Sequence, residues 1–179
     1  MKSTLTNMII SLTGITLIVG AALGLVYKLT EDPIVKAQAE ARIAAVSEIL
    51  PSFDDLETTT VNELTVYHAT KGDSDAGLAV ETFSDNGFGG RITLMAGFDV
   101  NSGITGFKVL SHAETPGLGA KMDDWFRNDQ VIGASTPLSV KQDGGNVDAI
   151  TGATITSRAF TDALNKAREA FNDYYNGRK

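Results

Sequence analysis

Three short stretches of this 179-residue chain combine glycine with side chains that can contact or carry a phosphate. They are residues 87–90 (GFGG), 112–121 (HAETPGLGAK) and 148–154 (DAITGAT), and the last precedes a helical pattern. Thr151 and Thr154 flank a Gly-Ala pair there, which is more hydroxyl than one helix cap requires. A helix start offers free N–H groups and the positive end of its dipole, and small residues let the backbone approach a ligand. These residues predict a candidate phosphate site before a helix.

Composition excludes several other kinds of site. None of the three stretches contains the GK[ST] of a Walker A loop or the GxGxxG of a dinucleotide fingerprint. Taken singly, each could also be an ordinary turn, because glycine and proline are common in loops. The chain has no cysteine, which excludes disulfides, thiolate zinc sites and cysteine-ligated iron–sulfur clusters. Its two histidines, His68 and His112, lack ligand spacing, so no metal site is expected. The 15 basic against 22 acidic residues argue against binding to nucleic acid. Redox chemistry would need an organic cofactor.

Taken together, the three stretches resemble motifs of one known family. Residues 148–154 match the flavinylation motif Dxx(S/T)GA(T/S) of FMN-binding domains in the G subunit of Rnf complexes and the C subunit of Nqr. Residues 112–121 match that family's HxETPGLG segment, which lies against the flavin, and residues 87–90 resemble its GYGG with Phe88 in place of tyrosine. The resemblance covers most of the chain, and the short length without insertions is more similar to Rnf G than to Nqr C.

The resemblance implies that Thr154 carries FMN, its hydroxyl esterified to the FMN phosphate, whereas the alternative is a simple helix cap. Asp148 would be recognised by the flavin transferase, which takes FMN from FAD with Mg²⁺; a turn aspartate is the alternative. Thr151 fits phosphate binding and loop support equally well, and Thr156 or Ser157 is expected to cap the helix. The full set of expected cofactor contacts is Glu114, Thr115, Gly117, Leu118, Gly119, Lys121, Thr151, Gly152, Ala153 and Thr156.

Three residues, one of them in that set, keep two interpretations each. His112 is either a proton donor to the reduced flavin or a histidine at a strand end. Trp125 either packs on the flavin or is buried for stability. Lys121 either balances the negative charge of the phosphodiester or is solvated. No catalytic residue beyond the flavin is expected.

The rest of the sequence predicts an anchored α+β protein. Residues 8–27 are almost wholly apolar and long enough, at roughly 30 Å, to span a bilayer as a helix. We expect a short cytoplasmic N-terminus at 1–7, this transmembrane helix, a linker helix at 28–51 and an extracytoplasmic FMN-binding domain at 52–179. A signal peptide cut near the small residues 19–22 is the alternative, but the positively charged region before the apolar run holds only Lys2.

Within the extracytoplasmic part, short strands lie between two helices, which favours an antiparallel sheet. Asp32-Pro33 is typical of a capped helix start, and Pro51 ends that helix. Phe160 and Phe171 delimit the apolar spacing of a closing helix. A strand, a turn and a short strand are expected over residues 136–151. Four other segments have the pattern of strands: residues 64–70, 77–83, 91–100 and 104–114.

By resemblance, the chain is a covalently flavinylated electron-transfer subunit of an Rnf-type complex, which couples electron transfer between NADH and ferredoxin to Na⁺ or H⁺ translocation. Its partners would be the other Rnf subunits, the flavin transferase and membrane lipid. It would lie in the cytoplasmic (inner) membrane as a single-pass protein with its soluble domain on the periplasmic side. The alternatives are a free-standing flavinylated reductase for an extracellular acceptor, an Nqr-type C subunit, and an anchored binding domain without flavin.

Overall fold

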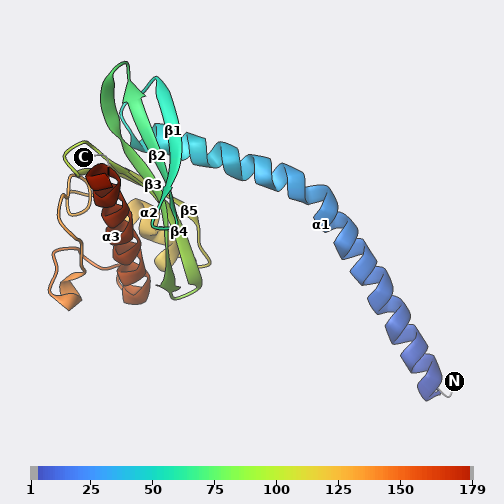
Figure 1. Ribbon diagram of the computed structural model, residues 1–179. Coiled ribbons are helices and arrows are strands. Elements are labelled where there is room, and N and C mark those ends of the chain that lie inside the picture. The colour runs from blue at the N-terminus through green and yellow to red at the C-terminus, as the bar shows by residue number, and fades with distance from the viewer. Residues whose placement is uncertain (1–3, 178–179) are drawn as a thin grey trace. The chain divides into compact units, whose positions relative to one another are not determined.

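The α+β class expected from the sequence is confirmed by the computed structural model, which describes residues 4–177 (Figure 1). The chain divides at Ala41 and Arg42 into a helical part and a second part that holds the sheet. The helical part consists of most of α1 (Leu5–Ile49). Its large apolar side chains are exposed, Ile18 for example at 71%. The helix is long and apolar enough to cross a membrane, which indicates a membrane anchor.

The helix expected from Asp32-Pro33 does not start there but continues from the apolar segment, because α1 runs through Pro33 without a break. Proline lacks an N–H group, so the helix loses one backbone hydrogen bond there. The alanine-rich residues that follow have high helix propensity, and the helix continues to Ile49.

The sheet is a five-stranded antiparallel meander in which each strand pairs with the next along the chain. Four of the strands were predicted, and the first was missed because its sequence, DLETTTV, is mostly polar and exposed. The strand pair expected over residues 136–151 is also wrong, since only an isolated bridge between Val140 and Val147 forms beside a short 3₁₀ helix, η2 (Lys141–Asp143). The apolar residues of that segment are buried without a ladder. The strands are β1 (Asp55–Val61), β2 (Leu64–Lys71), β3 (Ser74–Gly87), β4 (Gly90–Phe98) and β5 (Ile104–Ser111).

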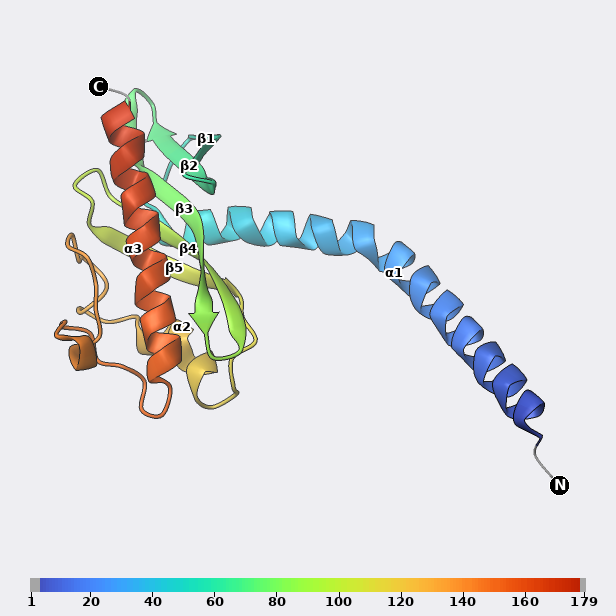
Figure 2. The same ribbon diagram turned by 60° about the horizontal axis from the view of Figure 1, so that its bottom comes forward.

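The closing helix α3 (Thr154–Gly177) lies across one face of the sheet and packs mainly on β3 and β4 (Figure 2). Alternate residues of β4 face it, Ile92, Leu94 and Phe98 among them, and all three are fully buried. The opposite face is covered by the last turns of α1, where Val46 and Ile49 join a second apolar cluster. The central strands of the sheet, β3 and β4, are therefore covered on both sides.

An aromatic cluster fixes the start of α3 against the segment that follows β5. Phe160 stacks on Phe126 with ring centres 4.3 Å apart and meets Phe107 of β5 edge-on at 4.8 Å. Phe126 directly follows the short helix α2 (Met122–Trp125), which continues from the 3₁₀ helix η1 (Gly119–Lys121). The cluster thus joins the stretch at 112–121 to the helix that begins at Thr154.

Truncation of this cluster should weaken the whole domain. Phe160→Ala removes a fully buried ring and should lower the free energy of unfolding by about 3–5 kcal/mol, because the ring leaves a cavity. Phe88→Ala is the control, since Phe88 is 69% exposed and its loss should change stability by roughly 0.5 kcal/mol or less. Denaturant unfolding of the detergent-solubilised chain measures both, and equal losses would contradict the assignment.

Candidate functional site

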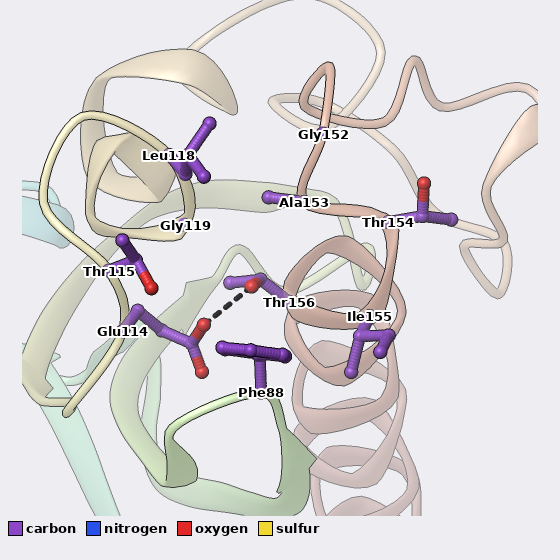
Figure 3. A pocket seen from close by; sticks show the side chains of 10 residues that line it. All are labelled: Phe88, Glu114, Thr115, Leu118, Gly119, Gly152, Ala153, Thr154, Ile155 and Thr156. Carbon is purple, nitrogen blue, oxygen red and sulfur yellow. Dashed lines mark hydrogen bonds between the residues drawn. The ribbon is translucent and has the colours of Figure 1, made fainter.

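The three glycine-bearing stretches meet around one pocket of about 440 Å³ (Figure 3). The hairpin between β3 and β4 supplies one lining residue, the segment after β5 supplies four, and the turn before α3 together with its first residues supplies the rest. The lining residues are Phe88, Glu114, Thr115, Leu118, Gly119, Gly152, Ala153, Thr154, Ile155 and Thr156. Residues separated by more than 60 positions in the chain therefore share one cavity.

Most of the predicted contact residues line this pocket, but three do not. Gly117, Lys121 and Thr151 are outside its lining and are exposed. Phe88 and Ile155 line it although neither was among the predicted contacts. The resemblance of GFGG to GYGG was a signal for Phe88, whereas Ile155 had none beyond its place next to Thr154.

The Glu114 carboxylate connects the β3–β4 hairpin with the first turn of α3. Its side chain is buried, with the residue only 5% exposed, and each oxygen accepts one hydrogen bond. Oε1 accepts from the backbone N–H of Gly89 at 3.0 Å, and Oε2 accepts from Oγ1 of Thr156 at 2.6 Å (Figure 3). Because one donor lies in the β3–β4 hairpin and the other in the first turn of α3, this carboxylate fixes the walls of the pocket relative to one another.

Thr156 and Ser157 do not cap α3 as expected. Both lie within its first turn and are buried, with Thr156 bonded to Glu114. The Ser157 hydroxyl donates to the carbonyl of Ala153 and accepts the N–H of Ile150, both at 2.9 Å. The capping prediction is wrong because α3 begins at Thr154, so both residues lie inside the helix rather than before it.

Two glycines are required by the geometry of the site. A side chain at Gly119 would place its Cβ 2.5 Å from Oγ1 of Thr156 and 2.7 Å from Oε2 of Glu114. Gly119 therefore leaves room for that hydrogen bond, besides any approach to a ligand. Gly152 has a φ of +78°, which other L-residues rarely adopt, and it forms the tight turn before Thr154.

Thr154 is the first residue of α3 and is partly exposed, with its side chain directed away from Glu114 and Phe88 (Figure 3). The first N–H groups of a helix have no partner within the helix and favour an anion. The pocket beside them is walled by apolar side chains that remain exposed, Phe88 at 69%, Ile155 at 49% and Leu118 at 42%. A flat, largely apolar ring with a phosphate group fits this combination.

Asp148 lies outside the pocket, in a shallow surface hollow with Trp125, Asn128, Asp129 and Gln130. Its carboxylate accepts hydrogen bonds from Nε2 of Gln130 at 2.6 Å and from Nζ of Lys141 at 2.8 Å. These two partners, Gln130 foremost, hold the pKa of the Asp148 carboxyl below its ordinary value.

The structure favours the structural interpretation of His112 and gives Trp125 a different contact. His112 is exposed, and its Nδ1 accepts the backbone N–H of Glu114 at 3.1 Å. Trp125 is outside the pocket lining, and its indole N–H donates to the carbonyl of Asp148 at 2.9 Å.

Comparison with known proteins finds a matching family model and several similar proteins. Residues 87–169 match the family model of the FMN-binding domain. The chain is 36% identical over 173 residues to the G subunit of the ion-translocating oxidoreductase complex of Methanosarcina acetivorans, covering 91% of this chain and 92% of the relative. The proteins of the same name from Shewanella amazonensis (33% over 177 residues, 87% and 82% covered) and Vibrio cholerae (31% over 171 residues, 84% and 82% covered) are also similar.

Loss of the Glu114 carboxylate should cost stability through its two donors. Glu114→Ala leaves the Gly89 N–H and the Thr156 hydroxyl without their acceptor, and we expect a loss of about 1–3 kcal/mol in the free energy of unfolding. Glu114→Gln should cost less, because the amide can accept from Gly89 and donate to Thr156. Denaturant unfolding measures both variants. If the glutamine variant loses as much free energy of unfolding as the alanine variant, the two hydrogen bonds are not the cause of the loss.

Proposed function

The chain belongs to the family of G subunits of ion-translocating oxidoreductase complexes and contains an FMN-binding domain, and from that membership we propose that Thr154 carries FMN as a phosphate ester. The observation that carries the proposal is the position of Thr154. Its hydroxyl stands at the N-terminus of α3, beside a pocket with exposed apolar walls, and follows two small residues. An ester there would place the phosphate at the helix start and the ring in the pocket.

The attachment reaction needs FAD as the donor. The phosphoanhydride of FAD breaks, a bond forms between the FMN phosphorus and Oγ1 of Thr154, AMP leaves, and the hydroxyl loses its proton. A flavin transferase using Mg²⁺ performs this step and recognises the exposed Asp148. The turn at Gly152 and the small Ala153 leave the approach to Thr154 open.

Bound FMN supplies the capacity to accept and pass on one or two electrons. The protein's own residues bind and orient it. Phe88, Leu118 and Ile155 cover its apolar ring and exclude water. Thr115 and the backbone of Gly119 contact the polar edge of the ring. The hydrogen bond between Glu114 and Thr156 holds the walls of the pocket in place.

The chain acts as one electron carrier within a larger complex. It has no cysteine for an iron–sulfur cluster and no dinucleotide fingerprint, so it relays electrons between NADH and ferredoxin only with the help of other subunits. Its anchor carries no charge between residues 3 and 27, so conduction of Na⁺ or H⁺ belongs to those partners. The three relatives named above are all G subunits by name, which favours this function over that of an Nqr-type C subunit.

The site assignment predicts the mass of the denatured protein. The wild type should exceed its sequence mass by FMN minus one water, and Thr154→Ala should have the sequence mass while remaining folded. Thr154→Ser is the matched control, because it keeps a hydroxyl at the same place and should still carry flavin. Mass spectrometry and in-gel fluorescence measure both, and a fluorescent Thr154→Ala band would refute the assignment.

We also place the FMN-binding domain outside the cytoplasm. Lys2 precedes the apolar run, and the Lys28 that follows it has acidic neighbours. This distribution slightly favours an N-terminus in the cytoplasm. An ester would retain the flavin where the cytosolic FMN pool cannot replace it. A reporter active only in the oxidising compartment, fused after Lys179, should therefore function, and its cytosolic counterpart should not. The reverse result would invert the topology.

A further inference from the structure

Two residues outside the flavinylation motif hold its first residue in place. Gln130 bonds to Asp148 twice, through Nε2 to the carboxylate at 2.6 Å and through Oε1 from the backbone N–H at 2.7 Å. Trp125 donates its indole N–H to the carbonyl oxygen of the same residue at 2.9 Å. The backbone and the side chain of Asp148 are thus both fixed by a segment that lies 18 to 23 positions earlier in the chain.

That segment is itself well supported. The side chain of Asn128 donates to the carbonyl of Trp125 at 2.8 Å and accepts the N–H of Gln130 at 2.9 Å. Phe126, between them, is fully buried and stacks on Phe160. The partners of Asp148 are therefore anchored in the domain core.

The far end of the motif is fixed as well. The N–H of Ala153 bonds to the carbonyl of Ile150 at 2.9 Å, and the Ser157 hydroxyl bonds to both residues. Between these two anchored ends lie Thr151 and Gly152, both exposed. The motif is consequently a loop of defined shape before any other protein binds it.

We propose that Gln130 and Trp125 are positioning residues for flavinylation, which fix Asp148 in the orientation that the flavin transferase recognises. The inference rests on the proposed attachment of FMN to Thr154. The Asp148 side chain remains half exposed in the surface hollow beside Trp125, so a transferase can reach it. A loop already ordered loses less conformational entropy when it is bound, which favours faster modification.

The test uses the full chain, purified in detergent from cells without flavin transferase and incubated with purified transferase, FAD and Mg²⁺. The initial rate of covalent flavin fluorescence on denaturing gels is measured. Gln130→Ala should load about tenfold more slowly, since two hydrogen bonds to Asp148 are lost. Trp125→Phe keeps the ring but lacks the N–H, and it should also load more slowly. Gln142→Ala, an exposed glutamine on the neighbouring η2, should load like the wild type.

A charge variant separates positioning from a general loss of structure. Gln130→Glu keeps the acceptor for the Asp148 N–H but places a second carboxylate next to the carboxylate of Asp148. The other charged groups here are Lys141, which is bonded to Asp148, and Asp129, which lines the same hollow. Its rate relative to the wild type should be low at neutral pH and should rise as the pH falls, because a protonated carboxyl can donate again. A ratio that does not change with pH would overturn the proposal.

The outcomes distinguish the two proposals. A wild type that gains no covalent flavin, or a Thr154→Ala variant that does, refutes the attachment site itself. A wild type that loads while Gln130→Ala and Trp125→Phe load at the same rate refutes the positioning role alone.

Discussion

The buried carboxylate of Glu114 is the constraint on which the pocket depends. A carboxylate removed from water must find donors, and here both donors are neutral groups from other segments, the N–H of Gly89 and the hydroxyl of Thr156. Satisfying them brings the β3–β4 hairpin and the start of α3 to the loop after β5. The absence of a side chain at Gly119 follows from the same requirement. The arrangement of the pocket walls is thus determined by hydrogen bonds within the chain, without a ligand.

The place of the candidate site, before the closing helix, could be predicted from the sequence because it depends on a local pattern. Residues 148–154 are contiguous, and a turn followed by a helix places Thr154 at a helix start whatever the rest of the fold does. The long-range contacts could not be predicted in this way. Glu114 and Thr156 are 42 positions apart, and Gln130 and Asp148 are 18 apart, so no periodicity relates them.

The errors in the predicted elements have the same origin. The strand β1 was missed because its polar residues are exposed at the edge of the sheet, where pairing rather than burial defines it. The segment 136–151 was assigned strands from its apolar residues, yet these are buried without a pairing partner beyond one bridge. Thr156 has the residue type of a cap, but its hydroxyl donates a hydrogen bond to the buried carboxylate of Glu114 instead. In each case tertiary contacts override a local preference.

The order of the elements along the chain has a consequence for biosynthesis. Every strand pairs with the one made just before it, so the meander can form progressively as the chain emerges. The face that α3 covers stays open until that helix, the final element, has been made. Because Thr154 begins the same helix, a product that stops before it lacks both this threonine and a closed core. The residue that we propose to carry FMN is therefore made together with the helix that completes the core.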